Sequence, residues 1–358
     1  MNRMLEFIIF FSFFLGVYAA MNYYAYLRLD IILGSRPWLM PLIILLGLSF
    51  PLLSVTERFM HHNTVRYAYI MSTIYLGVLF FMIVAFALLD LAHLGSLIAK
   101  SSFNYQLIGL IALIIVILVS GYSMFNATQL NIKKISVPGD DELKIVQLSD
   151  IHVGTIHTSR YLKKIVRISN EQEPDIVAIT GDLFDGSDGV NKELIMPLKD
   201  LKARLGVYFV TGNHETYLET DKIVEMVRSL NVTVLRNEMT EAGGVQIIGI
   251  DNPTNDLKNN IHHLKNMDID KKKTTILLYH TPIGVKEASE AGVDLMLSGH
   301  THNGQIWPFD IMVRLFFRYV KGLYEVGDMH LYLSPGAGTW GPPMRLGSRS
   351  EISVIEMK

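Results

Sequence analysis

Four stretches of the chain contain no charged residue, and each is long enough to cross a lipid bilayer as a helix. A bilayer core of about 30 Å needs roughly 20 apolar helical residues. A cleaved signal peptide explains only one N-terminal stretch, and four repeats also disfavour the alternative of a large soluble core. The charge-free stretches are residues 7–27, 37–56, 67–89 and 101–132. The sequence therefore predicts a transmembrane domain over residues 1–130, with about four helices at 7–28, 37–56, 67–91 and 105–126.

Charge separates this region from the rest of the chain. Only ten of the 66 Asp, Glu, Lys and Arg residues lie in residues 1–130. Four crossings place both ends of the region on one side, which is flanked by Arg3, Arg58, Arg66, Lys133 and Lys134. The other side is flanked by Arg28, Arg36 and Lys100. By the positive-inside rule, we expect an integral, multi-pass protein of the cell inner membrane with residues 131–358 in the cytoplasm.

Composition excludes several function classes. The chain has no cysteine, which rules out disulfides and cysteine-ligated metal sites. Residues 131–358 carry 26 Lys and Arg against 30 Asp and Glu, so no nucleic-acid partner is expected. The sequence lacks the G-x-S-x-G and G-x-x-x-x-G-K-[ST] patterns, and it indicates no protein partner.

From residue 131 onward, short apolar runs alternate with helical patterns, which predicts an α/β domain over residues 131–358. The runs are rich in β-branched residues and bounded by Gly, Asp or Asn, as strands are. Strands are expected at 143–150, 175–182, 206–213, 245–251, 274–280 and 293–300, and helices at 159–170, 191–204, 215–230 and 283–291. A turn signal at residues 138–140 (Pro-Gly-Asp) predicts a hairpin at the start of the domain.

Five of the six expected strands end in a side chain that can bind a metal: Asp150, Asp182, Asn213, His280 and His300. Ligands of α/β sheets bind beyond the carboxyl ends of the strands, so these side chains are expected to meet. Oxygen and imidazole donors suit divalent Mn, Fe, Co or Zn. Two such ions, roughly 3.5–4 Å apart, can hold a phosphoryl group and generate hydroxide from water. The pattern therefore favours hydrolysis without a protein nucleophile.

An ordered series of motifs carries a family resemblance. The series is Asp150-x-His152, Gly181-Asp182-x-x-Asp185, Gly212-Asn213-His214-Glu215, His280 and Gly299-His300-x-His302. It resembles the calcineurin-like metallophosphoesterases over about residues 143–305. The resemblance implies a four-layer α-β-β-α sandwich that hydrolyses a phosphodiester or pyrophosphate with water activated by two divalent metals, with manganese favoured.

The same resemblance implies roles for individual residues. One metal would be held by Asp150, His152, Asp182 and His302, and the other by Asp182, Asn213, His280 and His300. Asp182 would then bridge the two metals. His214 would face the substrate and stabilise the transition state or protonate the leaving group, and Asp185 would orient His214.

Three features near the C-terminus bear on the substrate. Asn303 stands where members with a similar motif generally have glycine, and asparagine tolerates the left-handed backbone that such a turn needs. Residues 306–327 mix bulky apolar side chains with three basic residues, which fits either a core element or an amphipathic segment on the bilayer surface. Arg345 lies in a Gly- and Pro-rich loop and is a candidate for phosphate binding, although pairing with an acidic side chain is an alternative.

The predicted partners are the lipid bilayer and a phosphoester or lipid pyrophosphate substrate. The chain looks like the membrane-associated branch of the family, whose neighbours include hydrolases of UDP-2,3-diacylglucosamine, so a lipid-linked nucleotide is the leading substrate class. One alternative is a membrane-tethered phosphatase of soluble or protein phosphoesters. The other is a non-catalytic membrane sensor, which the complete ligand series disfavours.

Overall fold

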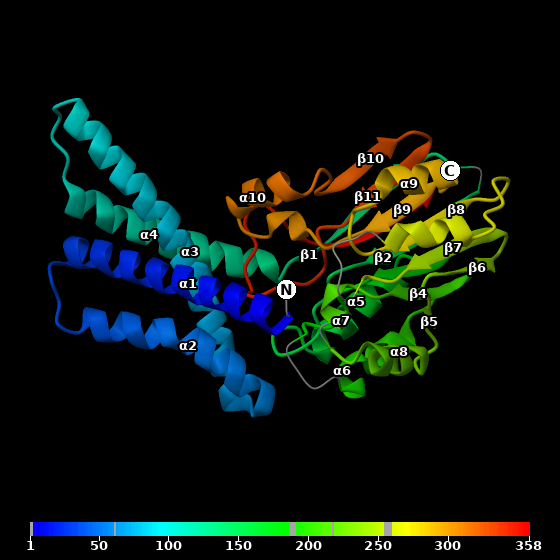
Figure 1. Cartoon of the computed structure of the whole chain (residues 1–358), viewed down its shortest axis with the longest axis horizontal. Helices are drawn as coiled ribbons and strands as arrows, with labels where there is room; N and C mark the ends of the chain where they lie inside the picture. The colour runs from blue at the N-terminus through cyan, green and yellow to red at the C-terminus, as the bar shows by residue number, and fades with distance from the viewer. Residues whose placement is uncertain (1–2, 61, 140, 187–190, 217, 254–259) are drawn as a thin grey trace. The chain divides into compact units, whose positions relative to one another are not determined.

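The chain divides into two compact units in a computed structural model that describes residues 3–60, 62–139, 141–186, 191–216, 218–253 and 260–358 (Figure 1). The first unit comprises Met1–Met124 and Gly341–Met344. The second comprises Phe125–Trp340 and Arg345–Lys358.

Four long helices lie where the charge-free stretches predict them. They are α1 (Arg3–Leu33), α2 (Leu39–Phe59), α3 (Asn63–Ile98) and α4 (Tyr105–Ala127). Helices α2, α3 and α4 are long and apolar enough to cross a membrane. A fourth crossing by α1 stays a prediction, because the side chains of its first turns are outside the described part of the chain.

Polar contacts join three of these helices. The carboxylate of Asp90 in α3 lies 2.9 Å from Nε of Arg28 in α1. It also accepts hydrogen bonds of 2.6 Å from the hydroxyls of Tyr24 in α1 and Tyr105 in α4. Ionisable side chains between membrane helices are generally paired in this way, so Asp90 helps to hold the helices as one bundle.

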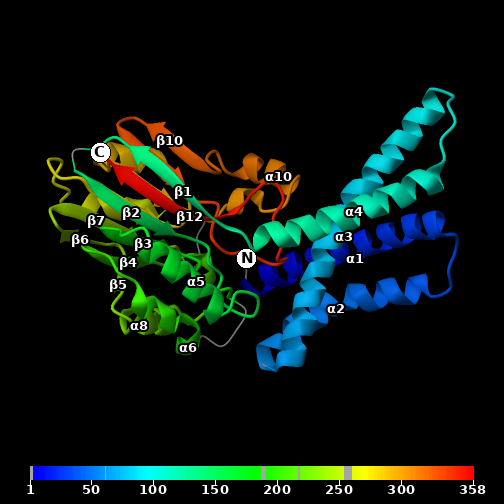
Figure 2. The same ribbon diagram turned by 180° about the vertical axis from the view of Figure 1, so that it is seen from behind.

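The second unit contains two six-stranded sheets (Figures 1 and 2). The first has the order β1-β12-β2-β3-β4-β5 and the second β10-β11-β9-β8-β7-β6. The strands are β1 (Leu130–Val137), β2 (Leu143–Leu148), β3 (Ile176–Thr180), β4 (Gly206–Val210), β5 (Thr233–Val234), β6 (Glu238–Ala242), β7 (Val245–Ile250), β8 (Thr275–Tyr279), β9 (Leu295–Ser298), β10 (Gly322–Val326), β11 (Met329–Leu333) and β12 (Ser350–Met357). Strands β2 to β5 run parallel to one another, as do β7 to β9.

All six strands expected from the sequence are present, but the hairpin at the start of the domain is wrong. Strand β12 lies between β1 and β2, parallel to β1 and antiparallel to β2. The run around residues 138–140 therefore connects two strands that do not pair, and Asp140 itself is outside the described residues. A local turn signal cannot reveal a strand that arrives from the other end of the sequence.

Three buried apolar clusters define the layers of this unit. One lies between the first sheet and its helices, where Leu162 and Ile165 contact the strands. The second lies between the two sheets and includes Tyr208 and Leu278. The third lies between the second sheet and its helices and includes Val285. Each buried side chain of this size contributes roughly 1.5–3 kcal/mol, and the order of layers is that of an α-β-β-α sandwich.

The helix expected over 159–170 is present with the same bounds, and the other three expected helices are shorter than predicted. The helices and 3₁₀ turns of the sandwich follow in chain order. They are α5 (Ser159–Asn170), α6 (Lys192–Ile195), the 3₁₀ turn Met196–Asp200, α7 (Asn213–Thr216), α8 (Thr220–Arg228), the 3₁₀ turn Asn260–Asn266, α9 (Val285–Ala291), the 3₁₀ turn His302–Gly304 and α10 (Phe309–Phe316). The helix expected over 191–204 is broken near Pro197, which has no N–H to continue the α-helical hydrogen bonds.

Candidate metal centre

The candidate ligands follow the carboxyl ends of strands in both sheets. Asp150, Asp182 and Asn213 come after β2, β3 and β4 of the first sheet, and His280 and His300 come after β8 and β9 of the second. Parallel strands present their carboxyl ends at the same edge. The two sheets pack face to face, so the structure brings both sets of side chains together.

Asp150, His152 and His302 form one group whose ligand atoms all lie within 4.8 Å of one another. The Nε2 atoms of His152 and His302 are 3.1 Å apart, and Nε2 of His302 lies 3.3 Å from Oδ1 of Asp150. The carboxylate of Asp150 is fixed by the hydroxyl of Ser149 at 2.5 Å and by the backbone N–H of His300 at 3.0 Å. These donors therefore point at a common centre.

Asp182, His280 and His300 form a second group within the same 4.8 Å limit. The amide oxygen of Asn213 joins them, at 3.1 Å from Nε2 of His280 and 2.8 Å from Nδ1 of His300. Nδ1 of His280 is 2.8 Å from the carbonyl oxygen of Thr180. When Nδ1–H donates to that carbonyl, Nε2 is left free to bind a cation, an arrangement common in metal sites.

Asp182 lies between the two groups. Its Oδ2 is 3.1 Å from Nε2 of His280 and 3.9 Å from Nε2 of His152. Its Oδ1 accepts a hydrogen bond of 2.9 Å from the backbone N–H of His214. This position is the one that a bridging carboxylate requires, and the bridging role stays a prediction.

His214 is oriented toward the same centre, and ligand atoms of His214, His152 and Asp185 all lie within 4.8 Å of one another. Its Nδ1 lies 2.7 Å from the backbone carbonyl oxygen of Asp185, and its Nε2 lies 3.9 Å from Oδ2 of Asp182. The carboxylate of Asp185 lies 3.7 Å from Nδ1 of His152. Asp185 thus lies beside both imidazoles, and its role in orienting His214 stays a prediction.

The backbone is left-handed at five of the seven candidate ligands. The φ angles at these residues are +51° at Asp150, +52° at His152, +49° at Asp182, +73° at His300 and +48° at His302. A non-glycine residue in this region carries a strain of about 1–3 kcal/mol and persists only where its surroundings fix it. Such residues gather at functional sites, and no sequence pattern reveals them.

Glu215 is a buried residue of the site to which the sequence assigned no function. Its carboxylate accepts backbone hydrogen bonds from Asp182 at 2.9 Å, Gly212 at 2.7 Å and Phe184 at 3.0 Å. Burial, reinforced by the nearby charge of Asp182, raises the pKa of Glu215 to about 7. Glu215 therefore holds the loop that carries Asp182. Its place in the motif after His214 was the only sequence signal.

Two glycines allow the close approach of the chain segments around the site. A Cβ atom at Gly212 would overlap the carboxylate of Asp182, and one at Gly299 would overlap Ser149 and the carboxylate of Asp150. Neither position can carry a side chain without displacing a candidate ligand. The glycines in both motifs are thus explained by packing.

The protonation states of most of the group fit cation binding. His280 is the exception: burial opposes its charge, but the carboxylate of Asp182 outweighs this effect and raises the pKa of His280 to about 10, so His280 releases a proton when a cation binds. Burial lowers the pKa of His152 and His302 well below the ordinary range, and that of His300 to about 4, so these imidazoles are neutral near pH 7. Burial also opposes the charge of Asp182, but the adjacent His280 outweighs this effect and holds the pKa of Asp182 well below its usual range. Neutral imidazoles and ionised carboxylates are the forms that bind divalent metals. The residues therefore fit the predicted metals.

Arg345 lies beneath the site rather than open to a substrate. Its Nη2 donates to the carbonyl oxygens of Pro335 at 2.8 Å, Gly336 at 3.1 Å and Gly338 at 2.6 Å, and it lies 3.5 Å from Nδ1 of His302. The side chain is fully buried, and burial lowers the pKa of Arg345 to about 10. This geometry favours a structural role over phosphate binding.

Asn303 adopts the left-handed conformation expected of it, with φ +50° and ψ +38°. Its amide nitrogen donates to the carbonyl oxygen of Gly347 at 3.3 Å. The turn after His302 therefore forms with asparagine in place of glycine.

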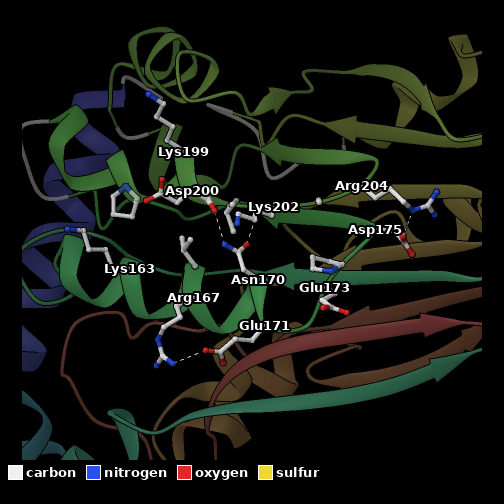
Figure 3. Close-up of a pocket in the computed structure, with 15 residues that line it drawn as sticks. Lys163, Arg167, Asn170, Glu171, Glu173, Asp175, Lys199, Asp200, Lys202 and Arg204 are labelled. Carbon is white, nitrogen blue, oxygen red and sulfur yellow. Dashed lines mark hydrogen bonds and ion pairs between the residues drawn. The ribbon is translucent and has the colours of Figure 1, made fainter.

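A hollow of about 1410 Å³ lies at the opposite edge of the first sheet (Figure 3). Its lining residues precede β3 and β4, whereas the candidate ligands follow these strands. Four of its nine charged side chains form ion pairs with each other, Arg167 with Glu171 at 2.8 Å and Arg204 with Asp175 at 2.7 Å. The hollow is thus separate from the metal centre and contains none of its ligands.

Comparison with known proteins identifies the family. Residues 143–304 match the family model described as calcineurin-like phosphoesterase. A Campylobacter jejuni protein named as an uncharacterised metallophosphoesterase is 33% identical over 297 residues, which covers 78% of each chain. The chain belongs to the calcineurin-like metallophosphoesterase family.

Two further relatives match a smaller share of the chain. A Helicobacter pylori protein, also named as an uncharacterised metallophosphoesterase, is 39% identical over 227 residues, covering 61% of this chain and 60% of the relative. A Bos taurus protein named as a transmembrane protein with a metallophosphoesterase domain is 38% identical over 241 residues, covering 61% of this chain and 53% of the relative. The chain thus spans a little over half the length of these two relatives. The apolar helices together with the transmembrane relative indicate a membrane protein.

Proposed function

We propose that this protein is a membrane-anchored, metal-dependent hydrolase of phosphoric ester or pyrophosphate bonds. The observation that supports the proposal is the convergence of seven side chains with oxygen or imidazole donors, Asp182 and six others, from both sheets. Two divalent cations bound by these residues supply Lewis acidity toward a phosphoryl group and lower the pKa of water. Manganese is the favoured metal among manganese, iron, zinc and cobalt.

His214 is the residue assigned to the leaving group. Hydrogen bonding of its Nδ1–H to the carbonyl of Asp185 leaves Nε2 directed into the site. When Nε2 also carries a proton, His214 donates a hydrogen bond or that proton to an oxygen of the phosphoryl group as charge develops on it, and the ring is then left as the neutral Nδ1–H form. Asp182 and Asn213 fix the neighbouring imidazoles and so keep this geometry.

The favoured substrate is a lipid-linked phosphodiester or pyrophosphate, such as a lipid-linked nucleotide. Support comes from the apolar helices, which keep the domain in a membrane where lipid substrates are concentrated. The runner-up is a tethered phosphatase of soluble or protein phosphoesters. An inner-membrane location with the domain in the cytoplasm completes the proposal and rests on the basic residues that flank the helices.

Asp182→Ala tests the site. The purified full-length chain is stripped of metal, reloaded separately with Mn²⁺, Fe²⁺, Zn²⁺ or Co²⁺, and assayed with bis-p-nitrophenyl phosphate. We expect metal-dependent turnover that Asp182→Ala reduces to the level of the metal-free chain. Asp221→Ala removes an exposed carboxylate on α8 and serves as the matched control, with activity retained. Unchanged hydrolysis by Asp182→Ala would overturn the site.

A substrate panel tests the substrate class. UDP-2,3-diacylglucosamine, other lipid pyrophosphates and soluble phosphoesters are compared at equal concentrations with the same metal-loaded enzyme. We expect the lipid-linked compounds to have the higher kcat/KM. Equal kcat/KM for soluble compounds, with and without lipid present, would favour the tethered phosphatase instead.

A further inference from the structure

An exposed apolar surface surrounds α10. All eight residues of this helix are described, and none of them is buried. Leu315 and Phe316 are 73% and 77% exposed. The α10 surface consists of the large exposed side chains Trp307, Phe309, Ile311, Met312, Leu315, Phe316 and Trp340. Contiguous apolar side chains of this kind mark a binding surface in most proteins.

The charges around α10 are mainly positive. Residues 306–321 contain Arg314, Arg318 and Lys321 but only one acidic residue, Asp310. Arg314 is exposed and lies 3.7 Å from the Asp310 carboxylate, and the guanidinium of Arg318 lies 5.5 Å from the ring centre of Tyr319. An apolar surface with tryptophan and basic neighbours is typical of segments that lie in the headgroup region of a bilayer.

The α10 surface borders the candidate metal centre. The ring of Phe317, which directly follows α10, contacts the ring of His300 with centroids 5.3 Å apart. The ring of Trp340 contacts that of His214 at 6.3 Å. The main chain of Trp340 is held by two hydrogen bonds with the side chain of Gln305, at 2.9 and 3.0 Å. Whatever binds the α10 surface therefore lies next to the residues proposed to act on a phosphoryl group.

Hydrogen bonds connect the α10 surface to the last turn of α4 within the second unit. The side-chain amide of Asn126 donates to the carbonyl oxygens of Arg345 and Ser348, both at 2.9 Å. Between these two residues, the carbonyl of Leu346 accepts a hydrogen bond of 2.8 Å from the backbone N–H of Trp307. Trp307 is thus linked to Asn126 through one hydrogen bond to Leu346 and another from Asn126 to the adjacent Arg345. Asn126 lies at the end of α4, which is long and apolar enough to cross a membrane.

We propose that the α10 surface lies in the headgroup region of the bilayer that α4 crosses. A helix of eight residues is about 12 Å long, far less than the roughly 30 Å of a hydrocarbon core, so α10 lies in the interface and does not span. The surface brings phosphate groups of membrane lipids to the metal centre, and this consequence rests on the proposed function. The contact with the bilayer itself does not depend on catalysis.

Tryptophan quenching tests the contact. The chain has three tryptophans, Trp38, Trp307 and Trp340. The variant W38F/W340F keeps Trp307 alone and is reconstituted at full length in nanodiscs of phosphatidylcholine and phosphatidylglycerol with brominated acyl chains. We expect lipids brominated near the headgroup to quench Trp307 more strongly than lipids brominated near the chain end. Quenching of Trp307 by aqueous acrylamide without quenching by either brominated lipid would overturn the proposal.

A matched control places tryptophan on another exposed apolar position of the same unit. Met196 lies in the 3₁₀ turn that follows α6, and α6 is well apart from α10 in both views (Figures 1 and 2). In a chain with all three native tryptophans changed to Phe, Met196→Trp should be quenched by acrylamide and not by brominated lipid. Equal lipid quenching at both positions would show that Trp307 has no special contact, and would also overturn the proposal.

Paired substitutions test the consequence for turnover. Ile311 and Leu315 lie one turn apart on α10 and are both exposed, so I311E/L315E should leave the fold intact. Because removal of two apolar anchors weakens surface binding, we expect kcat/KM for a lipid-linked pyrophosphate in vesicles to fall by about tenfold or more. Turnover of bis-p-nitrophenyl phosphate should stay unchanged, as it should in the control M196E.

The outcomes separate this proposal from the proposed function. If the wild-type chain hydrolyses no phosphodiester, the proposed function fails, and the quenching result still decides the bilayer contact. If the soluble diester is hydrolysed and I311E/L315E acts normally on vesicles, the link between the α10 surface and turnover fails. If I311E/L315E instead converts a dimer to a monomer by light scattering, the surface binds a second copy, and the bilayer proposal is overturned.

Discussion

Replacing Glu215 is the sharpest test of how the metal centre is held together. The carboxylate is fully buried and accepts three backbone hydrogen bonds, two of them from Asp182 and Phe184 in the loop that carries the proposed bridging ligand. The third comes from Gly212, next to Asn213. Glu215→Ala removes all three acceptors at once. Glu215→Gln can keep its amide oxygen as the acceptor for the N–H groups of Asp182 and Gly212, but its NH₂ group then faces the N–H of Phe184, which loses its acceptor.

The expected losses follow from these contacts. A buried N–H left without an acceptor destabilises the fold by about 1–3 kcal/mol, so Glu215→Gln should cost about that much and Glu215→Ala about 3 kcal/mol or more. For a domain of this size, 1 kcal/mol corresponds to a fall of about 2–4 °C in Tm. Glu215→Ala should therefore lower Tm by about 6 °C or more. Its metal content should fall too, because the loop with Asp182 is no longer fixed.

The assay combines three measurements on the full-length chain in detergent: Tm, metal bound per chain by mass spectrometry, and hydrolysis of bis-p-nitrophenyl phosphate. Glu225→Ala on α8 removes an exposed glutamate and controls for the loss of a carboxylate. We expect the order wild type and Glu225→Ala, then Glu215→Gln, then Glu215→Ala in all three measurements. A Glu215→Ala chain with full metal content and wild-type turnover would refute the holding role of Glu215.

Three further substitutions test other features. Burial lowers the pKa of His157 to about 3, so between about pH 6.5 and pH 3 only the unfolded chain gains a proton, and the folded state loses stability as the pH is lowered. His157→Gln keeps an acceptor for the Thr339 N–H and should flatten this decrease of Tm with decreasing pH. A pH profile of Tm identical to that of the wild type would contradict this. Gly299→Ala puts a Cβ onto the Asp150 carboxylate, so it should destabilise by about 1–3 kcal/mol and reduce bound metal, measured by Tm and metal analysis. Asn303→Gly keeps a left-handed turn and should change stability by no more than about 0.5 kcal/mol, with unaltered turnover of the soluble diester.

The sequence predicted those parts of the fold that depend on local patterns. The strand expected at 175–182 contains the apolar run 176–179, because strands covered on both faces have no polar side to alternate with, and the strand expected at 143–150 is mainly apolar with Lys144 and Gln147 within it. Polar side chains follow these runs directly, so the sequence pattern alone was enough to locate Asp150 and Asp182. The helical windows were equally clear, because a long charge-free run has few alternatives to a membrane helix.

The sequence could not predict the features that depend on distant chain segments or on backbone conformation. Strand β12 inserts between β1 and β2 by pairing across more than 200 residues of sequence, so the turn signal after β1 suggested a hairpin. Left-handed backbone at His152 and His302 is imposed by tertiary contacts and opposes the intrinsic preference of both residues. The sequence suggested Arg345 as a phosphate ligand, because a sequence cannot show that three carbonyl oxygens surround its guanidinium.

Hydrogen bonds within the second unit connect the last residues of α4 with the candidate metal centre. Asn126, in the last turn of α4, bonds to the carbonyl oxygens of Arg345 and Ser348, and the Ser350 hydroxyl donates to the carbonyl of Ala127. The same Arg345 reaches with its guanidinium to within 3.5 Å of His302. The end of a helix that can cross a membrane and a candidate metal ligand are therefore linked by one buried residue.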